Sequence, residues 1–269
     1  MLSCVRVMAD NRYPKDLLYS VYSPGRRLVE YVVEGKNVPG AMAKISNHLA
    51  ERGINILSGF HTGYPGEEAG VWGFFVDLTE AEVEPEEVAK QIGELDIVLD
   101  VRFSKAKFDG LIIDDLHFPI VVLGERSATL KVKTFGDMFE RLYEAFGSGA
   151  AVILYEMGVS AGGKEAKRVV ERYGIDGLRA LQIILAERVA KGWGIPNIAE
   201  FDEKRVEATI KVEDLFECLP FKGKYKEGRS HFFRGYLTGA FNQLFRKEAS
   251  TTEIECIAKG DANCKFTIA

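Results

Sequence analysis

The first part of the chain alternates short apolar runs with amphipathic segments. Four runs have strand composition, and two segments between them repeat apolar residues at helical spacing. The predicted strands are 28–34, 54–63, 70–78 and 97–103, and the predicted helices are 41–53 and 85–95. The order strand, helix, strand, strand, helix, strand predicts a ferredoxin-like βαββαβ domain over residues 28–105.

From residue 106 onward the pattern changes to longer helical segments that end in a hairpin. Helices are predicted at 135–147, 150–174, 177–194 and 230–248, a strand at 208–214, and hairpin strands at 251–258 and 263–269. Pro196 is expected to end the third helix. The whole pattern predicts an α+β protein: an N-terminal segment 1–27, the βαββαβ domain 28–105, and an α/β domain 106–269 whose antiparallel sheet packs on helices.

The loop and helix at residues 37–56 carry a motif of a polar residue, Pro-Gly, an apolar helix and Gly-Ile-Asn-Ile. Its positions are Asn37, Pro39, Gly40, Gly53, Ile54, Asn55 and Ile56. This motif resembles the ACT domain, a module that binds amino acids in regulated metabolic enzymes and transcription regulators. The resemblance implies an amino-acid ligand at Asn37, Val38, Pro39, Gly40, Ala41 and Asn55.

The physics of the Pro-Gly turn agrees with this implication, because the first N–H groups of a helix lack partners and can hold a carboxylate. Family members often have Asp where this chain has Asn37, and a neutral amide attracts an ammonium group less strongly. The alternative is a domain that only pairs with a second copy.

The C-terminal stretch 252–266 combines Glu-x-x-Cys, Gly-Asp, a second Cys and an aromatic residue. These are Glu253, Cys256, Gly260, Asp261, Cys264 and Phe266. The motif resembles the end of the 4-vinyl reductase domain, which also occurs in phenol-sensing input domains of transcription activators. That resemblance implies zinc held by the Glu, the two Cys and one more Cys before a Gly-rich helix, a ligand set that suits Zn²⁺.

The fourth ligand departs from that pattern, because Ser230 stands where the family has its cysteine. We therefore name Glu253, Cys256, Cys264 and His231 as the expected ligands. Cys218, twelve residues before Ser230, is an alternative fourth ligand. A degenerate, metal-free hairpin is the third possibility.

The resemblance also implies an apolar ligand in a cavity between the helices and the sheet. Phe232 and Tyr236 of the Gly-rich helix are the candidate ligand-binding residues. Aromatic residues at helical spacing also serve as ordinary core. Likewise, Gly235 and Gly239 could simply allow close helix packing.

Composition limits the class of protein. The 269 residues are 46% hydrophobic and 28% charged, with a net charge of −5, which is ordinary for a globular protein and unlike a general nucleic-acid surface. No apolar stretch approaches the length of a membrane span, and the N-terminus lacks the pattern of a signal peptide. Four cysteines are too few for a disulfide scaffold, and Cys4 is interpreted as an isolated thiol. These features predict a cytoplasmic protein without a membrane partner.

Together these observations predict a non-catalytic, ligand-sensing regulatory protein that forms a homodimer and acts through a regulatory partner protein. The abundance of Glu and Lys over Gln suggests a heat-adapted source. Two alternatives remain: a vinyl-reductase-like enzyme, and a DNA-binding regulator that uses the basic stretch 222–234. No catalytic Ser/His/Asp arrangement or phosphate loop is evident in the sequence.

Overall fold

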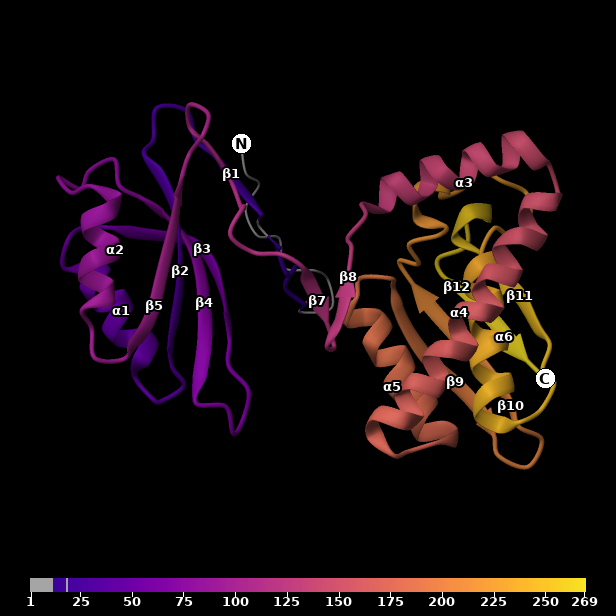
Figure 1. Ribbon diagram of the computed structural model, residues 1–269. Helices are drawn as coiled ribbons and strands as arrows, with labels where there is room; N and C mark the ends of the chain where they lie inside the picture. Colours follow the sequence, from indigo (N-terminus) through magenta and orange to yellow (C-terminus); the bar gives the residue numbers. More distant parts are fainter. Residues whose placement is uncertain (1–11, 18) are drawn as a thin grey trace. The chain divides into compact units, whose positions relative to one another are not determined.

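The computed structural model describes residues 12–17 and 19–269, and its contacts divide into two compact units, Met1–Ser127 and Ala128–Ala269 (Figure 1). The predicted α+β class is confirmed. The division falls later than residue 105 because β6 (Leu111–Ile113) pairs with β1 (Ser20–Tyr22) and belongs with the first unit. Cys4 lies outside the described residues.

The first unit contains a four-stranded antiparallel sheet in the order β3-β4-β2-β5. Its elements are β2 (Leu28–Lys36), α1 (Ala41–Ala50), β3 (Asn55–Thr62), β4 (Ala69–Asp77), α2 (Pro85–Gly93) and β5 (Val98–Lys105). This order and pairing confirm the predicted βαββαβ arrangement. Two short strands, β7 (Ile120–Val122) and β8 (Glu125–Ser127), pair after β6.

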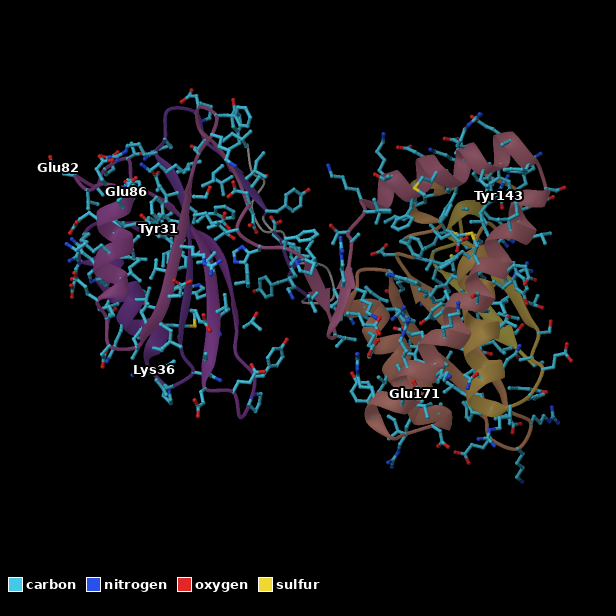
Figure 2. The ribbon with its side chains drawn as sticks, viewed as in Figure 1. Tyr31, Lys36, Glu82, Glu86, Tyr143 and Glu171 are labelled. Carbon is cyan, nitrogen blue, oxygen red and sulfur yellow. The ribbon has the colours of Figure 1, made fainter. Side chains whose placement is uncertain are left out.

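The two helices of this unit cover one face of the sheet (Figure 1). Tyr31 is fully buried on that face, and its hydroxyl donates a hydrogen bond to the carbonyl of Pro85 at the start of α2, at 3.0 Å (Figure 2). Residues alternate along a strand, so the neighbours of Tyr31 face the other way. There Leu28 and Phe75 pack with Ile112 of β6.

The second unit packs helices on a second antiparallel sheet, in the order β11-β12-β10-β9. Its elements are α3 (Val132–Phe146), α4 (Gly149–Tyr173), α5 (Gly177–Ala190), β9 (Ile195–Asp202), β10 (Glu207–Glu213), η1 (Leu219–Phe221), α6 (His231–Phe245), β11 (Thr251–Glu255), η2 (Ile257–Lys259) and β12 (Cys264–Ile268). Among the helices of residues 12–17 and 19–269, none has the length and apolar character to cross a bilayer.

Strand β9 is the main element that the sequence pattern missed. Pro196 indicates a helix end, yet it lies inside this strand and pairs with Val212 of β10. Because β9 is at the edge of the sheet, a residue without an N–H is tolerated there.

Helices α4 and α6 touch through their backbones. A Cβ atom added at Gly162 would lie 2.0 Å from the carbonyl oxygen of Tyr236, and one at Gly239 would lie 2.1 Å from that of Val159. Gly158 and Gly235 face the opposite helix in the same way, with Cβ positions 2.0 Å from a carbonyl oxygen. Four glycines therefore set the helix separation.

We predict that Gly162→Ala destabilises the second unit by about 1–3 kcal/mol, because the methyl group must push α6 away. Its neighbour offers a matched control, since a Cβ at Gly163 would lie at an ordinary 3.5 Å from the carbonyl oxygen of Gly239. Gly163→Ala is expected to be neutral or stabilising by up to about 1 kcal/mol. Urea unfolding of both variants tests this. Equal stability would contradict the backbone contact.

Candidate functional site

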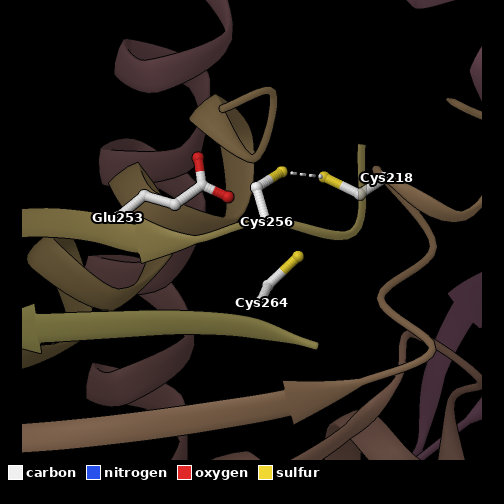
Figure 3. Close-up of side chains that lie close together, drawn as sticks. All are labelled: Cys218, Glu253, Cys256 and Cys264. Carbon is white, nitrogen blue, oxygen red and sulfur yellow. Dashed lines mark hydrogen bonds between the residues drawn. The ribbon is translucent and has the colours of Figure 1, made fainter. Parts of the chain in front are cut away.

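Three thiols and one carboxylate converge beside the start of α6. Cys218 precedes η1, Glu253 lies in β11, Cys256 follows β11, and Cys264 begins β12. One ligand atom from each lies within 4.8 Å of all the others, and the three cysteines are fully buried. Figure 3 shows the four side chains pointing toward one another, with the Cys218 and Cys256 sulfurs 3.5 Å apart. Soft thiolates with one carboxylate form a ligand set able to hold a metal ion.

The hairpin motif explains how two of these thiols come together. Gly260 ends η2 with φ 105°, which glycine adopts without steric cost. The Asp261 carboxylate accepts a hydrogen bond from the Cys256 N–H at 2.7 Å, which closes the turn. The Cys256 and Cys264 sulfurs accept from the N–H groups of Arg229 and Ile257, each at 3.4 Å. Both sulfurs are therefore fixed by backbone.

Ser230 lies among these ligands, at the position where a fourth cysteine was expected. Its hydroxyl oxygen is 3.0 Å from the Cys218 sulfur and donates to Glu253 Oε1 at 2.5 Å. It is also 3.4 Å from the Cys264 sulfur. The serine orients the Glu253 carboxylate, and Cys218 supplies the third thiol.

The structure does not bring His231 into the described cluster. Its Nδ1 lies 3.5 Å from Arg234 Nη2, and burial followed by the nearby Arg234 charge lowers the pKa of His231 to about 4. Successive residues of a helix point about 100° apart, so His231 turns away where Ser230 faces the thiols. Of the two residues considered for the fourth ligand, the structure places Cys218 there.

A fully buried carboxylate beside the cluster was missed by sequence reasoning. The Glu217 oxygens accept hydrogen bonds from the N–H groups of Phe232 and Phe233, both at 2.8 Å, and so cap α6 from a distant segment. Burial raises the pKa of Glu217 to about 8. A lone acidic residue within the apolar run around Cys218 was the available signal. The cap ties the Cys218 segment to the helix.

The electrostatics of the cluster concentrate negative charge on one sulfur. Hydrogen bonds from Cys218 and then Cys264 hold the pKa of Cys256 far below its ordinary value. The hydrogen bond to Cys256 is the main reason that the pKa of Cys218 is raised. Burial, and then the Cys256 charge, raise the pKa of Glu253 to about 8. A bound cation would allow the remaining ligands to ionise.

In the first unit, Asn37 has a structural task. Its side-chain nitrogen donates to the carbonyls of Tyr64 and Glu67, both at 3.0 Å, so the loop after β3 is tied to the loop after β2. An aspartate there would face two carbonyl oxygens, which explains the amide. Gly40 begins α1 with φ 86°, which glycine adopts most easily.

The structure separates Asn55 from this loop. Asn55 pairs with Asp77 at one end of β4, whereas Lys36, next to Asn37, pairs with Ala69 at the other end. At about 3.3 Å per residue the two ends lie about 26 Å apart. The loop of Asn37, Val38, Pro39, Gly40 and Ala41 is therefore a site without Asn55 from the same chain.

Phe232 and Tyr236 lie in the core of the second unit, where both contact Trp193, with ring centroids 5.7 and 5.3 Å away. The buried Tyr236 hydroxyl has no hydrogen-bond partner among the described residues. The Arg188 guanidinium lies over the same tyrosine at 5.1 Å. A depression of about 480 Å³ lies elsewhere, on α3 beside Met138 and Leu142.

The basic stretch 222–234 is partly used for packing. The Arg229 guanidinium lies 4.0 Å from the ring centres of both Tyr143 and Tyr225, and Arg234 lies 4.9 Å from that of Tyr155. Tyr143, labelled in Figure 2, belongs to α3. These two arginines thus join elements of the fold.

Comparison with known proteins agrees with this geometry. Residues 209–269 match the family model of the 4-vinyl reductase domain. The phenol-responsive sensory domain of the transcription activator PoxR, crystallised with phenol, is 19% identical, with a TM-score of 0.50 over 55% of this chain and 78% of that one. No curated protein matches.

Two further structures are more distant. A vinyl-4-reductase family protein from Methanocaldococcus jannaschii is 20% identical, with a TM-score of 0.38 over 53% of this chain and 83% of that one. The ACT domain of the GTP pyrophosphokinase of Chlorobium tepidum is 10% identical, with a TM-score of 0.25 over 29% of this chain and 99% of that one. The shared fold and the family match lead to one conclusion: residues 209–269 form a 4-vinyl reductase domain.

Proposed function

We propose that this is a non-catalytic regulatory protein that senses small molecules and passes the signal to a partner protein. The observation that carries the proposal is the buried group of three thiols and a carboxylate, set in a fold that is shared with a phenol-responsive sensory domain. The first unit would bind an amino acid and the second an apolar compound.

The metal in the second unit would be zinc, held by Cys218, Glu253, Cys256 and Cys264. Zn²⁺ accepts thiolate and carboxylate ligands without a redox change, and four ligands complete its tetrahedron. Its charge would offset the thiolates that burial otherwise disfavours. The ion would fasten the Cys218 segment to the hairpin, so its role would be structural.

We predict that Cys218→Ser abolishes zinc binding, because a serine hydroxyl is a poor zinc ligand at neutral pH. Ser230→Cys in the same chain should restore it, because the Ser230 oxygen already lies within 3.8 Å of the Cys256 sulfur. Mass spectrometry under native conditions gives the zinc content directly.

His231→Gln is the matched control, since it tests the other predicted fourth ligand and should retain zinc. Loss of zinc in His231→Gln with retention in Cys218→Ser would contradict this ligand set. Zinc absent from every form, after reloading in zinc-containing buffer, would remove the metal from the proposal.

The apolar ligand would lie beside Phe232 and Tyr236. The support is the unpartnered hydroxyl of Tyr236, which an apolar compound carrying one hydroxyl group could satisfy, together with the aromatic side chains around it. A buried polar group without a partner costs free energy, so such a ligand would gain from pairing with it.

Phenol is the probe for this site. We expect it to change the fluorescence of Trp193, which contacts both residues, in a Trp72→Phe background that leaves one tryptophan. Tyr236→Phe should weaken phenol binding about tenfold, the equivalent of one hydrogen bond. Tyr155→Phe, a tyrosine outside the Trp193 contacts, is the control. An unchanged Trp193 signal with phenol and larger aromatic alcohols would contradict the apolar site.

The amino-acid site would be the loop 37–41, where the N–H groups at the start of α1 could hold a carboxylate. Two copies of the βαββαβ domain would pair into a homodimer, and the bound ligand would change the free energy of that pairing. Such coupling requires different affinities for two states of the dimer.

Calorimetric titration with single amino acids tests this site. We expect one of them to bind, and Gly40→Ala to weaken its binding, because φ 86° is strained for alanine and the helix start would shift. Gly66→Ala, with φ 87° in another loop, controls for strain alone. A dimer that binds none of the amino acids would leave pairing as the role of this unit.

A further inference from the structure

A second group of titratable side chains lies in the first unit, on the face of the sheet opposite its two helices. Glu30 in β2 alternates with Val29 and Tyr31, which face the helices, so its carboxylate lies on the other face. The segment after β6 crosses this face and places Asp114 and His117 over Glu30. All three residues belong to the first unit.

The three side chains converge on one point. His117 Nδ1 lies 3.2 Å from Glu30 Oε1 and 3.0 Å from both carboxylate oxygens of Asp114. One ligand atom from each residue lies within 4.8 Å of the others. Such spacing suits atoms that share a single cation.

Burial makes this group costly without a cation. Glu30 is 1% exposed, and its second oxygen, Oε2, has no hydrogen-bond partner among the described residues. Even if His117 carries a proton, two carboxylates leave a net charge of −1 on a buried face. A divalent ion with neutral His117 would bring the sum to zero, which favours the cation over an ion pair alone.

We propose that Glu30, Asp114 and His117 bind a divalent transition-metal ion of the Zn²⁺ type. One imidazole nitrogen and two carboxylate oxygens are accepted zinc ligands, and three protein ligands leave a fourth position for water. That position would open toward the Asp114 and His117 side chains, which are 16% and 21% exposed. The ion would hold the segment after β6 against the sheet.

Neighbouring residues fix the ligands in place. The Asp114 carboxylate accepts hydrogen bonds from the N–H groups of Leu116 and His117 at 3.1 and 3.0 Å, which shapes the turn. The imidazole lies against Gly73, where a Cβ would come within 2.5 Å of the ring. The Phe60 ring meets it edge-on, with centroids 4.7 Å apart. Little rearrangement is needed for binding.

Zinc reloading of the chelator-treated full chain tests the proposal, with zinc content measured by elemental analysis and native mass spectrometry. We expect Glu30→Gln and Asp114→Asn each to remove one zinc per chain, with affinity at least about 100-fold weaker. Asp115→Asn is the matched control, because that adjacent carboxylate pairs with Lys107 outside the group. It should retain the ion.

This site and the thiol cluster are told apart by Cys256→Ser and by Co²⁺. Cobalt at the thiol cluster gives a sulfur-to-metal absorption band, which Cys256→Ser removes, whereas cobalt at Glu30, Asp114 and His117 gives none. If the thiol cluster binds no metal, the wild type should still hold one ion that depends on Glu30. Wild-type zinc content in both Glu30→Gln and Asp114→Asn would overturn the proposal, as would wild-type zinc that depends on Cys256 alone.

Discussion

The backbone contact between α4 and α6 is the constraint on which the second unit depends. Gly162 and Gly239 place each helix against the carbonyls of the other, with no room for a methyl group. The contact fixes where α6 begins, and Ser230, immediately before that helix, lies among the thiols. The ligand geometry is therefore set by helix packing some distance away, because a displaced helix would carry Ser230 with it.

Three buried carboxylates show how this chain compensates desolvation in different ways. Glu217 accepts two N–H groups at the start of a helix, where the helix dipole also favours negative charge. Glu253 accepts the Ser230 hydroxyl and N–H. Glu30 has a histidine on one oxygen and no described partner on the other. Glu217 is satisfied by backbone donors alone, so it is the one of the three that needs no further ligand.

The sequence predicts what local spacing determines. Periodicity indicates most helices and strands, and the pattern from Glu253 to Cys264 indicates a site, because a short hairpin alone brings those residues together. Cys218 and the contact of Glu30 with His117 depend on chain segments that meet only in the folded protein. Strand β9 was hidden because Pro196 gives the same signal at a helix end and at an edge strand.

The exchange of Ser230 for Cys218 changes which part of the molecule the thiol cluster fastens. A cysteine at position 230 would attach a metal directly to the start of α6. Cys218 instead belongs to the segment that leads into η1, and Glu217 beside it caps the same helix. Helix, preceding segment and hairpin thus form one linked structure, in which occupation of the cluster would order the segment first and α6 through its cap.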